Sequence, residues 1–146
     1  MEIVFAQIDQ LEAAARLFDH YRVFYEQSSD LAAARHFLQE RLEAKDSAIF
    51  LAVENARAIG FAQLYPSFSS VAMKRIWILN DLFVERSHRN QGIARLLMNA
   101  AKNHARDTGA IRINLSTQTG NAAAQSLYES LGYKKDSAFY HYGLPL

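Results

Sequence analysis

The sequence contains no cysteine, and none of its apolar runs approaches the length of a membrane span. The missing cysteine excludes disulfides, thiolate metal sites and a cysteine nucleophile. No signal-peptide pattern occurs at the first residues, so we expect a cytoplasmic protein with no membrane partner. The five histidines form no spaced ligand set, and we expect no metal.

The length and composition indicate one compact domain over residues 1–146. Hydrophobic residues make up 50% of the chain and charged residues 21%. A chain of 146 residues is long enough for one substantial core and too short for two.

The net charge of +1 conceals an asymmetry between the two parts of the chain. Residues 1–54 contain ten acidic and five basic residues, a net −5, and the remainder is net +6. An acidic part of this kind would suit a cationic partner, although solvated helix faces explain it equally well. The basic residues are dispersed, without a recognition-helix or aromatic RNA-binding pattern, so we expect no nucleic-acid partner.

The hydrophobic pattern predicts an alternation of strands and helices. Strands are expected at residues 2–8, 48–53, 58–65, 74–84 and 111–116, with two short ones near 133–135 and 139–144. Helices are expected after the caps Asp9, Asp30 and Asn121, and from about Gly92, with Gly132 ending the last. A hairpin is expected across 54–57 and a turn or bulge at 66–70. This order predicts an α/β fold with a mixed sheet.

The strand-to-helix junction over residues 82–95 is the most informative segment. The first backbone N–H groups of a helix have no intrahelical acceptor, and the helix dipole adds partial positive charge there. Gly92 and Ala94 leave room for an anion. Residues 86–106 carry five Lys or Arg and no Asp or Glu. The junction therefore predicts a site for a phosphorylated cofactor.

The junction also narrows the choice of phosphate-binding family. It lacks the Gly-Lys-Ser/Thr ending of a P-loop and the three spaced glycines of a dinucleotide-binding turn. Its Arg-x-x-Gly-x-Ala pattern resembles the pyrophosphate loop of the GNAT N-acetyltransferases. An ordinary strand-to-helix turn is the alternative for this motif alone.

A second motif is similar to the other GNAT signature, Asn-x-x-Ala-x-x-Leu/Phe-Tyr-x-x-x-Gly-Phe/Tyr. It matches at Asn121, Ala124, Leu127, Tyr128, Gly132 and Tyr133. The resemblance implies a GNAT-like, mostly antiparallel mixed sheet flanked by helices, in the order β-α-α-β-β-β-α-β-α-β-β. It also implies that the strands at 74–84 and 111–116 splay apart to admit the pantetheine arm of acetyl-CoA. The residues expected to bind acetyl-CoA are Leu82, Phe83, Val84, Arg89, Asn90, Gln91, Gly92, Ile93, Ala94, Arg95, Asn121 and Tyr128.

Two catalytic residues are expected. By resemblance, Tyr128 would protonate the CoA thiolate; packed core is the alternative, because Tyr128 shares one helical face with Ala124, Leu127 and Leu131. Asp81 is the one ionisable side chain between Ile76 and Val84, which makes it a candidate base or amine anchor. Relatives similar to polyamine acetyltransferases often carry a glutamate where this chain has Asn80, a departure that puts polyamine specificity and a direct carboxylate base in question.

The acceptor side is expected to involve Tyr25, Glu26, Tyr65, Asn80 and Asp81. The sequence around these residues resembles the histone/polyamine and diamine (thialysine) acetyltransferase subgroup. We therefore expect acetyl transfer to a small primary amine or amino-acid-like acceptor. A protein acetyltransferase and a non-catalytic acetyl-CoA-binding module are the alternatives. The aromatic-rich segment 139–144 predicts an edge strand and a homodimer.

Overall fold

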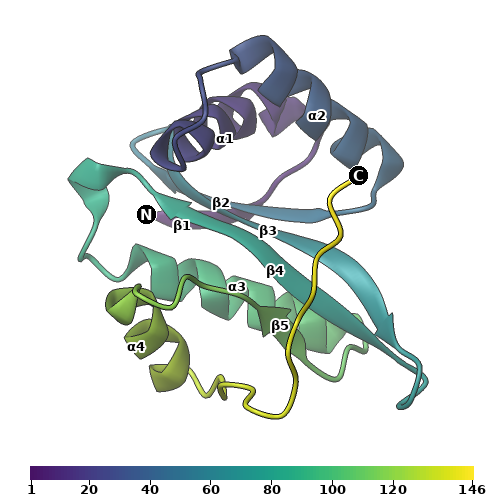
Figure 1. Cartoon of the computed structure of the whole chain (residues 1–146). Helices are drawn as coiled ribbons and strands as arrows, with labels where there is room; N and C mark the ends of the chain where they lie inside the picture. Colours follow the sequence, from purple (N-terminus) through teal and green to yellow (C-terminus); the bar gives the residue numbers. More distant parts are fainter. The chain divides into compact units, whose positions relative to one another are not determined.

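The computed structural model describes residues 1–146 as two compact units, residues 1–115 and 116–146. The first unit is built on a five-stranded sheet with the strands in sequence order (Figure 1). Its strands are β1 (Glu2–Phe5), β2 (Ala48–Glu54), β3 (Arg57–Ser69), β4 (Lys74–Val84) and β5 (Ile113–Leu115). Neighbouring strands are antiparallel except for β4 and β5, which are parallel. The expected mixed, mostly antiparallel sheet is therefore confirmed.

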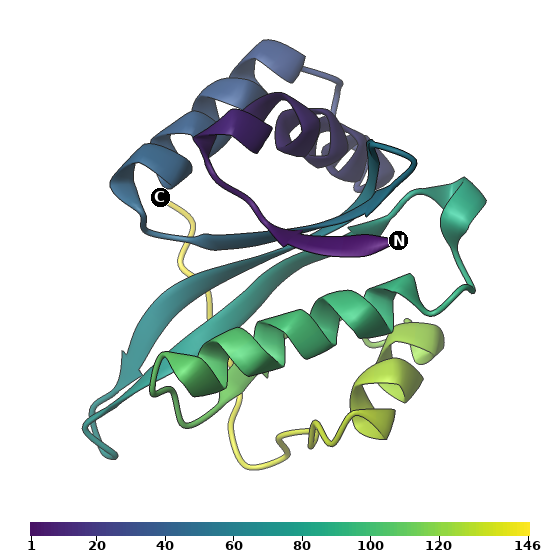
Figure 2. The same ribbon diagram turned by 180° about the vertical axis from the view of Figure 1, so that it is seen from behind.

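Helices cover both faces of this sheet. Helices α1 (Leu11–Phe24) and α2 (Leu31–Ala44) lie on one face, and α3 (Ile93–Asp107) lies on the other (Figures 1 and 2). Beneath α1 and α2, Leu17 and Leu38 pack in one buried cluster with Phe61 and Phe83 of the sheet. Because burial of apolar side chains is the main stabilising term in folding, this cluster fixes α1 against the ends of β3 and β4.

The β2–β3 hairpin forms where the sequence predicted it. Asn55 and Ala56 have positive φ angles of 51° and 61°, as a tight two-residue hairpin turn requires. The turn predicted at 66–70 is wrong, because β3 continues to Ser69 and pairs with β4 throughout. Pairing with β2 ends at Leu64, so Pro66 lies where β3 has a neighbour on one side only, a position that proline tolerates.

The first helix begins differently from the prediction. Asp9 does not cap it; instead a short 3₁₀ turn, η1 (Ile8–Gln10), precedes α1, and Gln7 and Gln10 bond each other reciprocally. Asp30 does cap α2, because its carboxylate accepts from the Ala33 N–H at 3.1 Å.

The second unit contains helix α4 (Ala122–Ser130), and its caps confirm the prediction. The Ala124 N–H donates to Asn121 Oδ1 at 3.1 Å, and Gly132 has a φ of 93° after the helix. The two strands predicted at 133–135 and 139–144 are wrong, because residues 133–146 have no regular structure and pair with no strand. A strand requires a hydrogen-bonding neighbour, which an aromatic pattern alone cannot supply. No helix in the structure has both the length and the apolar character needed to cross a membrane.

Candidate active site

A β-bulge in β4 sets the orientation of the candidate catalytic strand. Gln63 lies opposite Asp81 and Leu64 lies opposite Leu79, which leaves Asn80 without a partner across the ladder. A bulge of this kind re-aims the side chains on either side of it. After the bulge, Asp81 shares the α1-facing side of the sheet with Phe83.

Asp81 is a buried carboxylate, 5% exposed, held by uncharged donors. Gln63 Nε2 donates to its Oδ2 at 2.9 Å, and Asn80 Nδ2 donates to its Oδ1 at 3.1 Å. The Tyr21 side chain of α1 bonds the same carboxylate. Burial raises the pKa of Asp81 above its ordinary value, although these three hydrogen bonds act in the opposite direction. A carboxylate with a raised pKa is better suited to accept a proton near neutral pH.

Tyr65 lies within electrostatic range of Asp81. Burial, followed by the charge of Asp81, raises the pKa of Tyr65 to about 12. Its phenol therefore stays protonated at neutral pH and keeps an O–H to donate. The structure thus brings together three of the predicted acceptor residues, Asp81, Asn80 and Tyr65.

Tyr25 joins this group indirectly, and Glu26 does not. The ring of Tyr25 lies 5.0 Å from the ring of Tyr21, which in turn bonds Asp81. Glu26 is an exposed residue in the turn after α1, with a φ of 63°, and the structure shows no contact between it and Asp81.

The connection between α1 and α2 is fixed by a buried carboxylate, Asp19. Its Oδ2 accepts from the Ser29 hydroxyl at 2.6 Å and its Oδ1 from the Asp30 N–H at 2.7 Å. The Ser29 hydrogen bond is the main cause that lowers the pKa of Asp19. The turn that carries Tyr25 and Glu26 is therefore anchored at its far end.

The end of β4 has backbone groups that no strand uses. β5 pairs only with Trp77, Ile78 and Leu79, so β4 continues beyond its neighbour. The Glu85 N–H donates to the Ile59 carbonyl at 2.9 Å, and hydrogen-bonded residues alternate along an antiparallel pair. The backbone groups of Leu82 and Val84 therefore point away from β3, past the end of β5, whereas those of Phe83 point toward β3. This geometry fits the expected separation of the two strands.

The loop after β4 leads into a helix start without a side-chain cap. The chain passes through η2 (Arg86–His88), and then Asn90 and Gly92 adopt positive φ angles of 62° and 79°. The first helical bond of α3 joins the Leu96 N–H to the Gly92 carbonyl at 3.2 Å. The N–H groups of Ile93 and Ala94 therefore lack an intrahelical acceptor, and a Cβ placed at Gly92 would meet nothing within 4 Å. Such a helix start can bind a diphosphate.

The profile of the acetyltransferase (GNAT) family matches residues 11–133. The chain belongs to the GNAT family. It is therefore an N-acetyltransferase, and acetyl-CoA is the acetyl donor of that family.

Two relatives of this acetyltransferase match it along almost its whole length, and a third matches part of it. The uncharacterised N-acetyltransferase YhfO of Bacillus subtilis is 50% identical over 144 residues, which cover 99% of this chain and 97% of YhfO. A crystal structure of a probable acetyltransferase superposes with a TM-score of 0.95 at 45% identity, covering 100% of this chain and 98% of the other. The D-amino-acid N-acetyltransferase HPA3 of Saccharomyces cerevisiae is 31% identical over 87 residues, 60% of this chain and 54% of HPA3.

Arg89 of the acetyltransferase holds the loop after β4 through its side-chain contacts. Its Nε donates to the Val84 carbonyl at 2.9 Å, and its guanidinium lies 4.9 Å from the Phe24 ring centre and 5.7 Å from that of Phe83. Arg89 was predicted to bind the cofactor; in the structure its guanidinium stacks on aromatic rings and joins the loop to α1.

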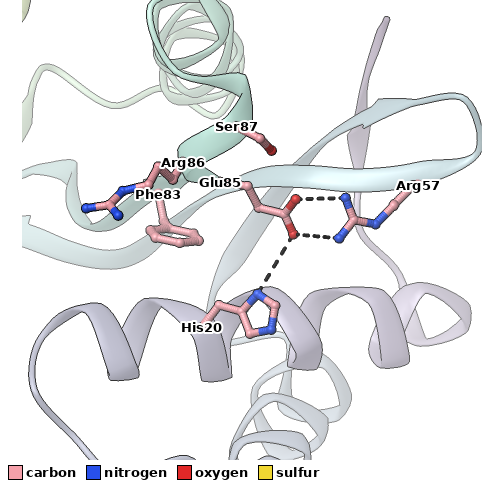
Figure 3. Close-up of a pocket in the computed structure, with 6 residues that line it drawn as sticks. All are labelled: His20, Arg57, Phe83, Glu85, Arg86 and Ser87. Atoms are coloured by element: carbon pink, nitrogen blue, oxygen red, sulfur yellow. Dashed lines mark hydrogen bonds and ion pairs between the residues drawn. The ribbon is translucent and has the colours of Figure 1, made fainter.

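A second anchor of the loop is Glu85, which sequence analysis did not identify. Its carboxylate accepts from Arg16 Nη1 at 2.6 Å. It also accepts from Arg57 Nη1 at 2.8 Å, and His20 Nδ1 lies 3.8 Å away (Figure 3). Burial raises the pKa of Glu85, but the bonds and charges of the two arginines outweigh it and leave the pKa low. An open hollow of about 500 Å³ is lined by Glu85, Arg57 and His20 together with Phe83, Arg86 and Ser87. Glu85 thus ties α1 and β3 to the start of the loop.

Gln63 is the other site residue that sequence analysis missed. Gln63 lies within β3 and Glu85 directly follows β4, and these polar residues are 0% and 8% exposed. That signal was present in the sequence, because polar residues in buried strands require a partner.

The remaining predicted residues belong to the second unit. Tyr128 is a partly buried residue of α4, and its ring centre lies 6.1 Å from that of Tyr133. Burial raises the pKa of the Tyr133 phenol. Asn121 caps the same helix through its side chain.

Proposed function

We propose that this acetyltransferase transfers the acetyl group of acetyl-CoA to a small primary amine or amino-acid-like acceptor, with Asp81 as the amine anchor and general base. The observation that carries the proposal is the buried Asp81 carboxylate with a raised pKa. It lies on β4, whose end pairs with β3 but has no neighbour on the β5 side, and which leads into the candidate anion-binding helix start.

The residues present fit acetyl-CoA. The N–H groups of Ile93 and Ala94 would hold its diphosphate, and the outward backbone groups of Leu82 and Val84 would hold the amides of its arm. Bound acetyl-CoA supplies a thioester that is reactive toward an unprotonated amine. The single-domain organisation over residues 1–146 and a cytoplasmic location belong to the same proposal.

The protein side of the chemistry consists of two proton movements. Asp81 would take a proton from the acceptor nitrogen, directly or through a water molecule, after pairing with its positive charge. Tyr128 would give its phenolic proton to the departing sulfur, as the family resemblance implies. Tyr65, protonated because its pKa is about 12, can orient the acceptor by hydrogen bonding near Asp81.

The surroundings of Asp81 favour an acceptor with an apolar body. Tyr21 and Tyr25 form an edge-to-face pair, and Phe24 is 54% exposed beside them. A single carboxylate beside these aromatic side chains suits an acceptor that has one ammonium group on an apolar or aromatic body. The 31% identity to HPA3, whose name describes a D-amino-acid N-acetyltransferase, supports an amino-acid-like acceptor.

A mass-spectrometric screen tests the proposal. The purified protein is incubated with acetyl-CoA and a panel of small amines and amino acids, in parallel with histone-like and N-terminal peptides. Small amines should be acetylated fastest, and Asp81→Asn should lower kcat/KM by roughly 10²–10⁴-fold, the range of general acid–base catalysis. Asp9→Asn, which alters an exposed carboxylate on η1, is the matched control.

Two results would contradict the proposal. Faster acetylation of peptides would favour a protein acetyltransferase. Acetyl-CoA binding with no acetylated acceptor in either panel would favour a non-catalytic module.

We also propose a homodimer. The expected edge strand at 139–144 does not form, but Phe139, Tyr140, Tyr142 and Leu144 are each at least 73% exposed. A cluster of exposed aromatic side chains favours association. Sedimentation analysis at high micromolar concentration should show a dimer, and a monomer there would contradict the proposal.

A further inference from the structure

Gln63 is a buried residue whose side-chain amide has a hydrogen bond at its nitrogen and none at its oxygen. Its Nε2 donates to Asp81 Oδ2 at 2.9 Å, whereas its Oε1 has no hydrogen-bond partner although the residue is 0% exposed. An acceptor buried without a donor is unfavourable, and such groups in folded proteins need an explanation. The explanation should lie in a state of the site in which a donor faces this oxygen.

The charge of Asp81 decides which end of the amide faces it. An ionised carboxylate only accepts hydrogen bonds, so Gln63 must present Nε2 and would be repelled through Oε1. A protonated carboxyl group has an O–H to donate. The same amide, turned over about its last side-chain bond, would then present Oε1 to that proton.

We propose that Gln63 is a positioning residue that partners Asp81 in both protonation states. Its Nε2 donates to the carboxylate before proton transfer, and its Oε1 accepts the Asp81 O–H afterwards. The inference rests on the proposed role of Asp81 as base. The proton leaves the acceptor nitrogen and binds one Asp81 oxygen; when it passes to water, the amide turns back. Gln63 itself neither gains nor loses a proton.

Uncharged hydrogen-bond partners have a direct effect on the protonation of Asp81. Its three hydrogen-bond partners, from α1, β3 and β4, are all uncharged. The titratable groups that face it are Tyr21 from α1 and Tyr65 from β3. Arg41 of α2 and Asp46 act on Tyr65, and they pair with each other at 2.8 Å. No cation is bonded to Asp81, so the orientation of the Gln63 amide weighs directly on the protonation of this carboxyl group.

Neutron diffraction on deuterium-exchanged crystals of the full chain tests whether the Gln63 amide rotates when Asp81 is protonated. The Asp81 midpoint is first measured by carbon-13 NMR of aspartate carboxyl groups and assigned by its absence in Asp81→Asn. Structures are then determined about two pH units above and below that midpoint, where each state is about 99% populated. Above it, a deuterium on Nε2 should point to Asp81; below it, a deuterium on Asp81 should point to Oε1. The same end of the amide facing Asp81 at both pH values would overturn the inference.

Gln63→Met provides a second test, because methionine matches glutamine in length and lacks its donor and acceptor. A hydrogen bond to a charged group is roughly twice as strong as a neutral one. In Gln63→Met, ionised Asp81 therefore loses more stabilisation than protonated Asp81 does. The midpoint should rise by about 0.5–1 pH unit. Gln39→Met, on α2, is the control and should leave it unchanged. An unmoved midpoint in Gln63→Met would count against the inference.

Neither readout requires turnover. Failure of the proposed function would instead appear as full activity of Asp81→Asn, or as the absence of any acetylated amine. The two failures are therefore distinguishable.

Discussion

Gly92 offers the sharpest test of the cofactor site. It precedes the N–H groups of Ile93 and Ala94, which have no intrahelical acceptor, and its φ is 79°. A side chain there meets no atom within 4 Å of its Cβ, so it would extend into open space at the helix start. Gly92→Glu therefore adds a negative charge at the expected diphosphate position without disturbing a packed neighbour.

The magnitude has two parts. A non-glycine residue in the left-handed region costs about 1–2 kcal/mol, and at about 3 °C per kcal/mol for a chain of this size the Tm should fall by about 3–6 °C. Two like unit charges about 8 Å apart, at an effective dielectric constant of about 20, repel by about 2 kcal/mol, which weakens binding by about 30-fold. Gly92→Gln carries the same strain without the charge.

Calorimetry at low ionic strength measures the Kd of acetyl-CoA for the wild type and both variants. We expect Gly92→Glu to bind about 30-fold more weakly than Gly92→Gln, with the difference shrinking at about 1 M salt, where the screening length is about 3 Å. Equal affinities of the two folded variants at low salt would refute the assignment of the diphosphate to this helix start.

Three further predictions address catalysis, strand packing and pH. Tyr128→Phe should lower kcat by roughly 10²-fold in steady-state assays with little change in acetyl-CoA affinity, and turnover within a factor of about two of wild type would reassign the residue to packing. Gly60→Ala should reduce the free energy of unfolding by about 1–3 kcal/mol in urea, because its Cβ would lie 2.9 Å from the Phe83 carbonyl oxygen; an unchanged midpoint would contradict that close approach. Asp19 has a lowered pKa in the folded state, so its stabilisation is complete above its unfolded pKa of about 4 and is lost as the pH falls through the folded value. Asp19→Asn should therefore destabilise the protein at pH 7, and this destabilisation should shrink as the pH falls below about 4. If the loss in free energy of unfolding, measured with urea, stayed constant over that range, Asp19 would not act through its charge.

Local features were predictable because they depend on residues close together in the chain. The caps Asp30 and Asn121, the hairpin at Asn55 and Ala56 and the glycine at the start of α3 all follow from short-range hydrogen bonding and backbone preference. The two GNAT motifs lie in such segments, so the family could be recognised from sequence. Where a local pattern was misleading, a distant partner decided the outcome: β3 extends to Ser69 because β4 is there to pair with it.

The chemistry at Asp81 depends on contacts between distant segments. The sequence identified Asp81 as an isolated carboxylate in an apolar strand, and with it the candidate base. Its partners Gln63 and Tyr21 come from β3 and α1, 18 residues away in the case of Gln63, and they meet it only because the bulge at Asn80 sets the register of β3 against β4. A shift of one residue would turn Asp81 to the opposite face of the sheet. The sequence by itself determined the family, the helix start and the acidic residue. The tertiary structure decided the burial that raises the pKa of Asp81 and the hydrogen bonds that oppose this rise, because both depend on strand register and helix packing.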